Sequence, residues 1–154
     1  MILLNDIVSM LLAVFLGSAI GLEREISGKS AGLRTNVLIC LGAAVFTIIS
    51  KNLGGSDDSV TRIAAQIVTG VGFLGAGAII RDRGGVQGLT TAATIWLVAS
   101  IGLACGGGYY GTALIATFIA VIVLIGLRHI AGPLENYLKK HKQEKTHGEE
   151  ASQK

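Results

Sequence analysis

The residues best suited to chemistry are polar side chains that flank long apolar runs of the sequence. Eight of them recur at the ends of four such runs, and we call them the polar cluster: Glu23, Arg24, Arg34, Thr35, Asn36, Asp82, Thr90 and Thr91. Charges at the edge of a hydrocarbon layer are costly unless they are paired or hydrated, so the acids and arginines of this set are expected to pair with one another. Two roles stay open for the cluster. It is either a salt-bridge network that anchors the apolar runs, or a site for an ion or a docking partner.

Other polar residues lie apart from this set. Gln66 lies one helical turn beyond Arg62 inside an apolar run, where its amide is expected to bond a neighbouring helix. Asp57 and Asp58 could attract a divalent cation, but two carboxylates on a loop are too few for a tight site. The sequence holds no zinc-type spacing, no H-E-x-x-H motif and no Ser–His–Asp set. It therefore predicts neither an enzyme nor a cofactor.

A group of glycines is the most ambiguous motif. Gly70, Gly72 and Gly75 match the G-x-G-x-x-G dinucleotide fingerprint. That fingerprint needs a preceding strand and an acid about 20 residues further on, whereas these glycines lie in one apolar run and residues 89–105 contain no acid. We interpret them, with Gly77, as packing glycines in a membrane helix, and we expect Trp96 to pack against the same face.

The composition predicts that the elements carrying these residues are membrane helices. Only 15% of residues are charged, below the roughly 25% of soluble domains, and the mean hydropathy is +0.62. No basic stripe alternates with aromatic residues, which argues against nucleic-acid binding. A helix of about 20 apolar residues spans a bilayer. The sequence predicts an all-α membrane protein with Gly-rich packing, a tendency to form homo-oligomers, and five transmembrane helices at about 7–22, 35–50, 63–80, 89–105 and 109–127.

The charges also predict an orientation and a domain division. With the C-terminus inside, eleven lysines and arginines fall on the cytoplasmic side and two outside, as the positive-inside rule requires. The N-terminus is then outside. Residues 1–132 form the predicted transmembrane domain, and residues 133–154 form a polar cytoplasmic tail.

Several motifs in order resemble the MgtC/SapB family of bacterial membrane proteins. They are GLERE at 21–25, AGLRTN at 31–36, RIAAQIV at 62–68, GFLGAG at 72–77 and GLTTAATIW at 88–96. The resemblance covers residues from about 7 to 130. It implies functional roles for most of the polar cluster, namely Glu23, Arg24, Arg34, Thr35, Asn36, Thr90 and Thr91. It also implies roles for a packing set made up of Gln66, the glycines at 70–77 and Trp96.

This resemblance implies a non-enzymatic protein of the bacterial inner membrane that serves magnesium homeostasis and stress adaptation and, in pathogens, virulence through survival inside host cells. Members are labelled magnesium transporters, but they are also interpreted as regulators of other membrane proteins, including the proton-translocating ATP synthase. The sequence departs from the family's namesake at Thr90 and Leu97, where the namesake has Asn and Cys. The namesake also carries a soluble C-terminal domain of the ACT type, for which the polar tail is too short.

Overall fold

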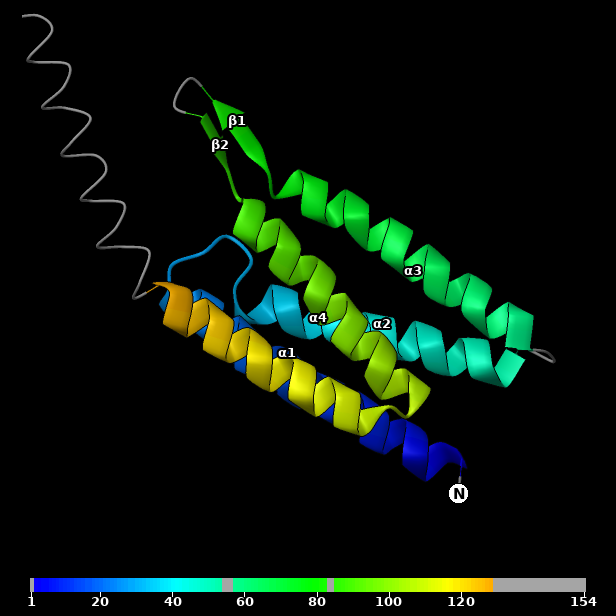
Figure 1. Cartoon of the computed structure of the whole chain (residues 1–154). Helices are drawn as coiled ribbons and strands as arrows, with labels where there is room; N and C mark the ends of the chain where they lie inside the picture. The colour runs from blue at the N-terminus through cyan, green and yellow to red at the C-terminus, as the bar shows by residue number, and fades with distance from the viewer. Residues whose placement is uncertain (1, 54–56, 83–84, 129–154) are drawn as a thin grey trace, which may run out of the picture. The chain divides into compact units, whose positions relative to one another are not determined.

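The computed structural model describes residues 2–53, 57–82 and 85–128, and the side chains of residues 2, 57–60, 63 and 82 lie outside this description. The described part is helical apart from one short hairpin (Figure 1). Its elements are α1 (Ile2–Ile26), α2 (Leu33–Leu53), α3 (Asp57–Gly77), β1 (Ile80–Asp82), β2 (Gly85–Gln87), α4 (Leu89–Gly107) and a fifth helix, Tyr110–Arg128. Residues Met1–Val121 form one compact unit.

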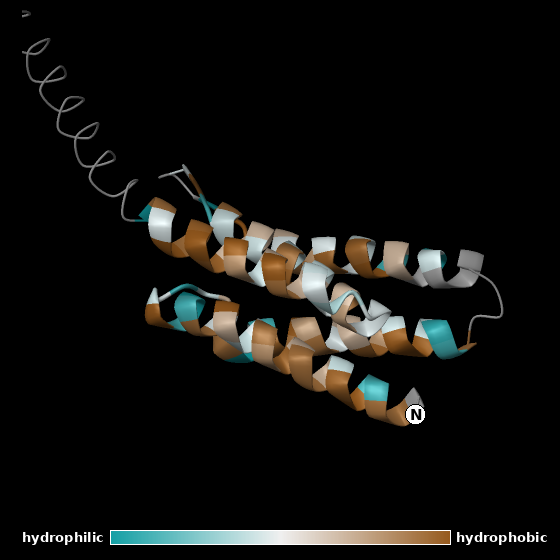
Figure 2. Cartoon of the chain, turned by 60° about the horizontal axis from the view of Figure 1, so that its bottom comes forward, coloured by the Kyte–Doolittle hydropathy of each residue, from teal (hydrophilic) through white to brown (hydrophobic). Residues whose placement is uncertain are grey.

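Four of the described helices are long and apolar enough to cross a membrane: α1, α2, α4 and the fifth helix. Figure 2 shows apolar residues along the middle of the helices and hydrophilic residues near their ends, the pattern of a membrane protein. The third predicted span falls in α3, where the apolar stretch found within the described residues, Ala64–Gly77, is shorter than the others. The helix stops at Gly77, because an antiparallel hairpin pairing Ile80 with Gln87 replaces the loop expected there.

Close helix packing is built on glycines outside the motif at 70–77. A Cβ added at Gly17 would lie 2.9 Å from the Cβ of Cys40, and one at Gly21 would lie 2.8 Å from the Cα of Leu33, so α1 and α2 meet at these positions. Gly102 and Gly106 bring α4 equally close to the backbone of α2. α2 and α4 each contact the other three of the helices α1 to α4, so these two helices form the centre of the unit.

The ends of two helices are closed by left-handed glycines. Gly28 has φ +64°, and the amides of Gly28 and Lys29 bond the carbonyls of Glu25 and Arg24, which completes a Schellman turn at the end of α1. Gly108, with φ +86°, ends α4 in the same way. These turns fix where α1 and α4 stop, and so determine which side chains gather at each end of the unit.

Polar bonds also tie the helices at the end where α2 and α4 finish. The ammonium of Lys51 donates to the carbonyl of Gly107 at 3.2 Å, joining the C-terminal ends of these two helices. The hydroxyls of Ser9 and Tyr110 lie 2.9 Å apart and connect α1 with the start of the fifth helix. The Lys51 contact is exposed, whereas the Ser9–Tyr110 contact is partly buried and so satisfies hydroxyls that would otherwise lack partners.

Candidate functional site

The candidate site lies where α1 ends, α2 begins and α4 begins, close to the β hairpin (Figure 1). Arg24, in the last turn of α1, is buried, with a side chain only 4% exposed. Its Nη1 lies 3.6 Å from Oε2 of Glu23, whose side chain is 9% exposed. The second oxygen of Glu23 accepts a 2.7 Å bond from the hydroxyl of Ser27, one turn later. The structure therefore places a buried acid–base pair in the last turn of α1, directly before the turn that leads to α2.

Arg24 also joins two helices that are distant in sequence. Its Nη2 donates to Oγ1 of Thr91 at 3.3 Å, across 67 residues of chain. Thr91 is buried in the first turn of α4, where the N-terminal residue is Gly88 in a left-handed conformation with no side-chain cap. Thr90 and Thr91 both lie in the first turn of α4, and Thr91 serves as an acceptor for Arg24 rather than as a cap.

Asn36, at the start of α2, is a third buried polar residue at this end, after Arg24 and Thr91. Its amide nitrogen donates to the carbonyls of Ala31 and Gly32, both at 2.8 Å, and so holds the loop against the start of α2. A Cβ at Gly21 would lie 3.2 Å from the Cβ of Asn36, which shows how closely α1 covers this side chain. The bond from the backbone amide of Leu33 to the Glu25 carboxylate, at 2.8 Å, closes the same loop from the outside.

Three buried polar atoms at this end have no hydrogen-bond partner within the described part of the chain: Oε2 of Glu23, Nε of Arg24 and Oδ1 of Asn36. Two are acceptors and one is a donor. A buried polar atom without a partner costs about 1–3 kcal/mol, so the local structure has unused capacity to bind water or a ligand. The Glu23–Arg24 pair has no net charge, so this position should bind neither a free cation nor a free anion strongly.

The polar cluster predicted from the sequence therefore divides into two groups. Glu23, Arg24, Asn36 and Thr91 are drawn into the interior, whereas Arg34, Thr35 and Thr90 are exposed. Among the described side chains, the expected ion pairing is seen between Arg24 and Glu23. Arg34 makes no ion pair with any described residue, because its side chain points to the surface of α2.

Two predicted positions fall outside the described side chains. Asp82 belongs to β1, but its side chain is not among those described. The same holds for Asp57 and Asp58 at the start of α3. No group of three or more His, Cys, Asp or Glu side chains occurs among the residues that the structure describes.

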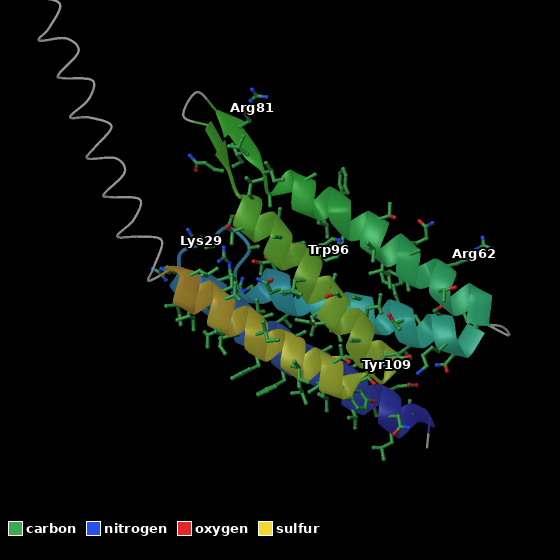
Figure 3. All side chains as sticks on the ribbon, viewed as in Figure 1. Lys29, Arg62, Arg81, Trp96 and Tyr109 are labelled. Atoms are coloured by element: carbon green, nitrogen blue, oxygen red, sulfur yellow. The ribbon has the colours of Figure 1, made fainter. Side chains whose placement is uncertain are left out.

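The predicted packing residues are exposed at Gln66, Gly70, Gly72, Gly77 and Trp96 and buried at Gly75. At Gly70, Gly72 and Gly77 an added Cβ would meet nothing within 4 Å, while at Gly75 it would lie 3.5 Å from the carbonyl oxygen of Ala92 on α4. Trp96 is 53% exposed on α4, and Figure 3 shows the positions of Trp96 and of Arg62, which projects from α3. Among these four glycines, only at Gly75 would an added Cβ lie within 4 Å of a neighbouring helix.

Sequence reasoning gave no role to two groups that the structure uses. Glu25 anchors the start of α2, and the pair at Gly102 and Gly106 allows α4 to touch the α2 backbone. The spacing of four between these glycines is a sequence signal that predicts a close helix contact. No comparable signal identifies Glu25, because its partner is a backbone amide.

Comparison with known proteins bears directly on these residues. The profile of the MgtC family matches residues 10–132, which include most of α1, all of α2, α3 and α4, and the whole candidate site. The chain belongs to the MgtC family. Protein MgtC of Salmonella typhimurium (strain LT2) is 50% identical over 131 residues, covering 85% of this chain and 56% of that protein.

A second relative gives the same result. Protein MgtC of Brucella abortus (strain 2308) is 47% identical over 123 residues, covering 80% of this chain and 51% of its own length. The chain thus spans little more than half the length of these MgtC proteins. No solved structure matches it.

Proposed function

We propose that this MgtC-family chain is a non-enzymatic regulatory or accessory protein of the bacterial inner membrane that acts in magnesium-linked stress adaptation. Family membership carries the link to magnesium. In structural terms, the main support is that Arg24 is held by Glu23 on its own helix and by Thr91 on α4. A buried arginine paired in this way resembles a structural tie between helices more than an open ion path.

The proposed regulation works through contacts with other membrane proteins. One face of α3 displays small residues at helical spacing, all exposed: Ala65, Thr69, Gly72 and Ala76. Small residues let a second transmembrane helix approach closely. By family resemblance, the proton-translocating ATP synthase is one candidate partner, and survival of a pathogen inside host cells is one setting.

The proposed orientation places the candidate site on the cytoplasmic side. Eleven lysines and arginines lie in segments assigned to that side and two, Lys51 and Arg62, in those assigned outside. The α1–α2 loop and the β hairpin, which carry Lys29 and Arg81, adjoin the same ends of the helices (Figure 3). An excess of positive charge at that end supports the N-terminus outside and the C-terminus inside.

A second candidate function is transport of a cation. The observation that favours it is the pair of buried oxygens without partners, Oε2 of Glu23 and Oδ1 of Asn36, near the same membrane surface. Oxygen atoms of carboxylates and amides are ligands for magnesium. Against it stands the positive charge of Arg24, 3.6 Å from that Glu23 oxygen.

Purified protein in liposomes separates the two functions. Under the regulatory proposal, magnesium, potassium and proton gradients produce no saturable flux when insertion is verified by protease protection. A saturable flux that Glu23→Gln removes would overturn the proposal and make Glu23 part of a transport site.

A growth test addresses the partner contact directly. In a strain that depends on its family member in low-magnesium medium, Gly72→Leu should abolish complementation, because it fills an open position on the small-residue face of α3. Gly111→Leu is the matched control, since a Cβ there also meets nothing within 4 Å. Equal growth of both variants at equal membrane abundance would contradict a partner contact at Gly72.

A further inference from the structure

Exposed cations gather at the end of the unit where α2 and α4 begin. Lys29 lies between α1 and α2, Arg34 lies in the first turn of α2, and Arg81 lies in β1. Within the described part of the chain, none of the three forms an ion pair. Glu25, an exposed acid at the same end, accepts a bond from the amide of Leu33 instead. These three positive charges are therefore available to a negatively charged group outside the chain.

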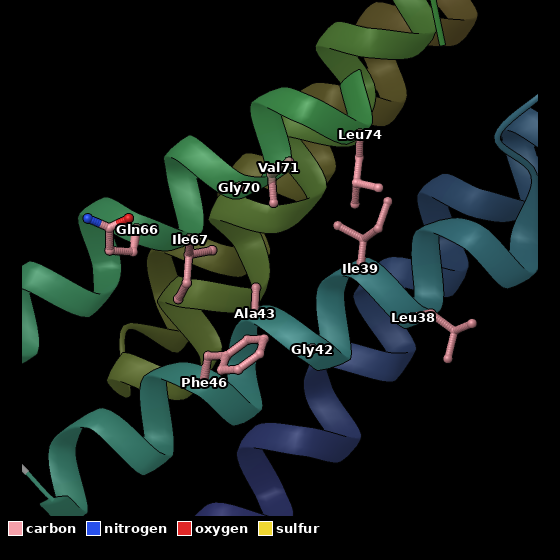
Figure 4. A pocket seen from close by; sticks show the side chains of 10 residues that line it. All are labelled: Leu38, Ile39, Gly42, Ala43, Phe46, Gln66, Ile67, Gly70, Val71 and Leu74. Carbon is pink, nitrogen blue, oxygen red and sulfur yellow. The ribbon is translucent and has the colours of Figure 1, made fainter. Parts of the chain in front are cut away.

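The packing of α2 against α3 brings Arg34 and the β hairpin to one end of these helices. Leu38 on α2 and Leu74 on α3 both line a groove between the two helices, and Leu74 points toward Ile39 (Figure 4). Arg34 lies one turn before Leu38, and β1 begins shortly after α3 ends. The start of α2 and the hairpin are therefore neighbours at the same end of the helices.

The helices that can cross a membrane set the depth of these charges. Lys29 lies between two of them, α1 and α2, and Arg34 lies in the first turn of α2. Arg81 pairs across the hairpin with Val86, and the chain from Val86 to Leu89, the start of α4, covers at most about 10 Å. The headgroup layer extends about 5–8 Å beyond the hydrocarbon on each side of a bilayer. Because an arginine side chain is long, the guanidinium of Arg81 can reach this layer.

The hairpin also exposes apolar side chains at the same depth. Ile80 is 63% exposed and Val86 is 50% exposed. Val86 lies directly opposite Arg81, so the two share one face of the hairpin, as cross-strand partners do. An apolar residue beside a cation is typical of a segment that lies in a membrane interface. A phospholipid supplies both a phosphate for Arg81 and an apolar layer for Ile80 and Val86, whereas an acidic protein segment supplies only the negative charge.

We propose that the β hairpin lies in the lipid headgroup layer and that Lys29, Arg34 and Arg81 bind the phosphate groups of anionic phospholipids. Cations close to a membrane-spanning helix are attracted to the negative charge of such lipids. In this arrangement the lipid holds the connection between α3 and α4 at the membrane surface. The interaction goes beyond the proposed function and does not depend on it.

Native mass spectrometry of the purified full chain, titrated with phosphatidylglycerol or phosphatidylethanolamine, tests the charge contacts. The triple variant Lys29→Gln, Arg34→Gln, Arg81→Gln should bind phosphatidylglycerol at least about tenfold more weakly, because each such cation contributes about fivefold. Arg62→Gln is the matched control and should change the affinity by less than about twofold. Arg62 is also exposed and makes no ion pair with a described residue, but it lies at the opposite end from Arg81 (Figure 3). Binding of phosphatidylethanolamine, which has no net charge, should be equal in all three proteins.

Fluorescence quenching in liposomes tests the depth of the hairpin. An environment-sensitive dye attached to Val86→Cys should be quenched by acrylamide at least about threefold less than the same dye on free cysteine, because lipid shields it from water. Val86 is exposed, so the dye does not disturb the packing of the helices. The native Cys40 and Cys105 are buried and should not take up the dye.

Each alternative gives a distinct result. Equal affinity of the triple variant and Arg62→Gln for phosphatidylglycerol would overturn the assignment of the three cations. Equal binding of the two lipids by the native chain would refute selection of anionic headgroups. A dye at position 86 that is quenched as fully as on free cysteine would show that the hairpin lies in water. If benzoylphenylalanine in place of Arg81 cross-links to a protein in native membranes, while the purified chain shows no preference for phosphatidylglycerol, the cations bind an acidic protein and the lipid site is refuted.

Discussion

Gly102→Ala tests whether the contact between α4 and α2 determines the stability of the unit. A Cβ at this position would overlap the carbonyl oxygen of Cys40 and lie 2.8 Å from its carbonyl carbon and 3.0 Å from the Cβ of Ala43. The carbonyl group belongs to the backbone of α2, so it cannot rotate out of the way as a flexible side chain would. The helices must therefore separate to accept one methyl group.

The expected magnitude follows from two opposing effects. Alanine is favoured over glycine inside a helix by about 1 kcal/mol. Overpacking a tight contact costs about 1–3 kcal/mol, and here the contact is with backbone, which places the cost in the upper part of that range. The net expectation is a loss of about 1–2 kcal/mol in the free energy of unfolding. Gly72→Ala is the matched control, because it gains the same helix preference with nothing within 4 Å.

The measurement is reversible unfolding of the purified protein in mixed micelles titrated with a denaturing detergent and followed by circular dichroism. Gly102→Ala should shift the midpoint to lower denaturant, while Gly72→Ala should leave it unchanged or raise it. If Gly102→Ala proves as stable as the native chain, the close approach of α4 to Cys40 does not exist in the folded protein. A loss of stability in both variants would show that the effect is not one of packing.

Two further predictions use the same unfolding assay. Arg24→Ala should lower the free energy of unfolding by about 3 kcal/mol, because it leaves the buried Glu23 carboxylate without its counter-charge, whereas the exposed Arg34→Ala should change it by less than about 0.5 kcal/mol. Similar values for the two arginine variants would contradict a buried pair. Ser9→Ala and Tyr110→Phe should each cost about 1 kcal/mol through loss of one 2.9 Å bond, and the double variant should cost no more than either alone. Additive costs would show that the two hydroxyls do not bond each other.

The sequence was sufficient to predict the helices, because long uncharged runs leave few alternatives in a bilayer. Four predicted spans correspond to helices long and apolar enough to cross a membrane, and residues matched to the MgtC family include all of the candidate site. The hairpin at Ile80–Gln87 was missed because its six paired residues include one glycine and two charged residues, which are equally typical of a loop.

The side-chain arrangement was less predictable, because a position's face depends on tertiary packing. Glu23, Arg24 and Asn36 converge, yet Arg34 and Thr35, adjacent to Asn36 in sequence, point outward because successive helical residues are about 100° apart. The density of glycines in the sequence also did not indicate which of them make close contacts. The run at 70–77 is the densest group of glycines, while the glycines at the close contacts of α2 with α1 and α4 are dispersed at Gly17, Gly21, Gly102 and Gly106.

The bond between Arg24 and Thr91 has a consequence for how the protein is made. The turn between α1 and α2 is closed by local bonds, so this pair of helices can assemble as soon as it leaves the ribosome. Thr91 is synthesised 67 residues after Arg24. Until α4 enters the bilayer, Arg24 lacks Thr91 as a hydrogen-bond partner. The insertion of α4 therefore completes the contacts of Arg24.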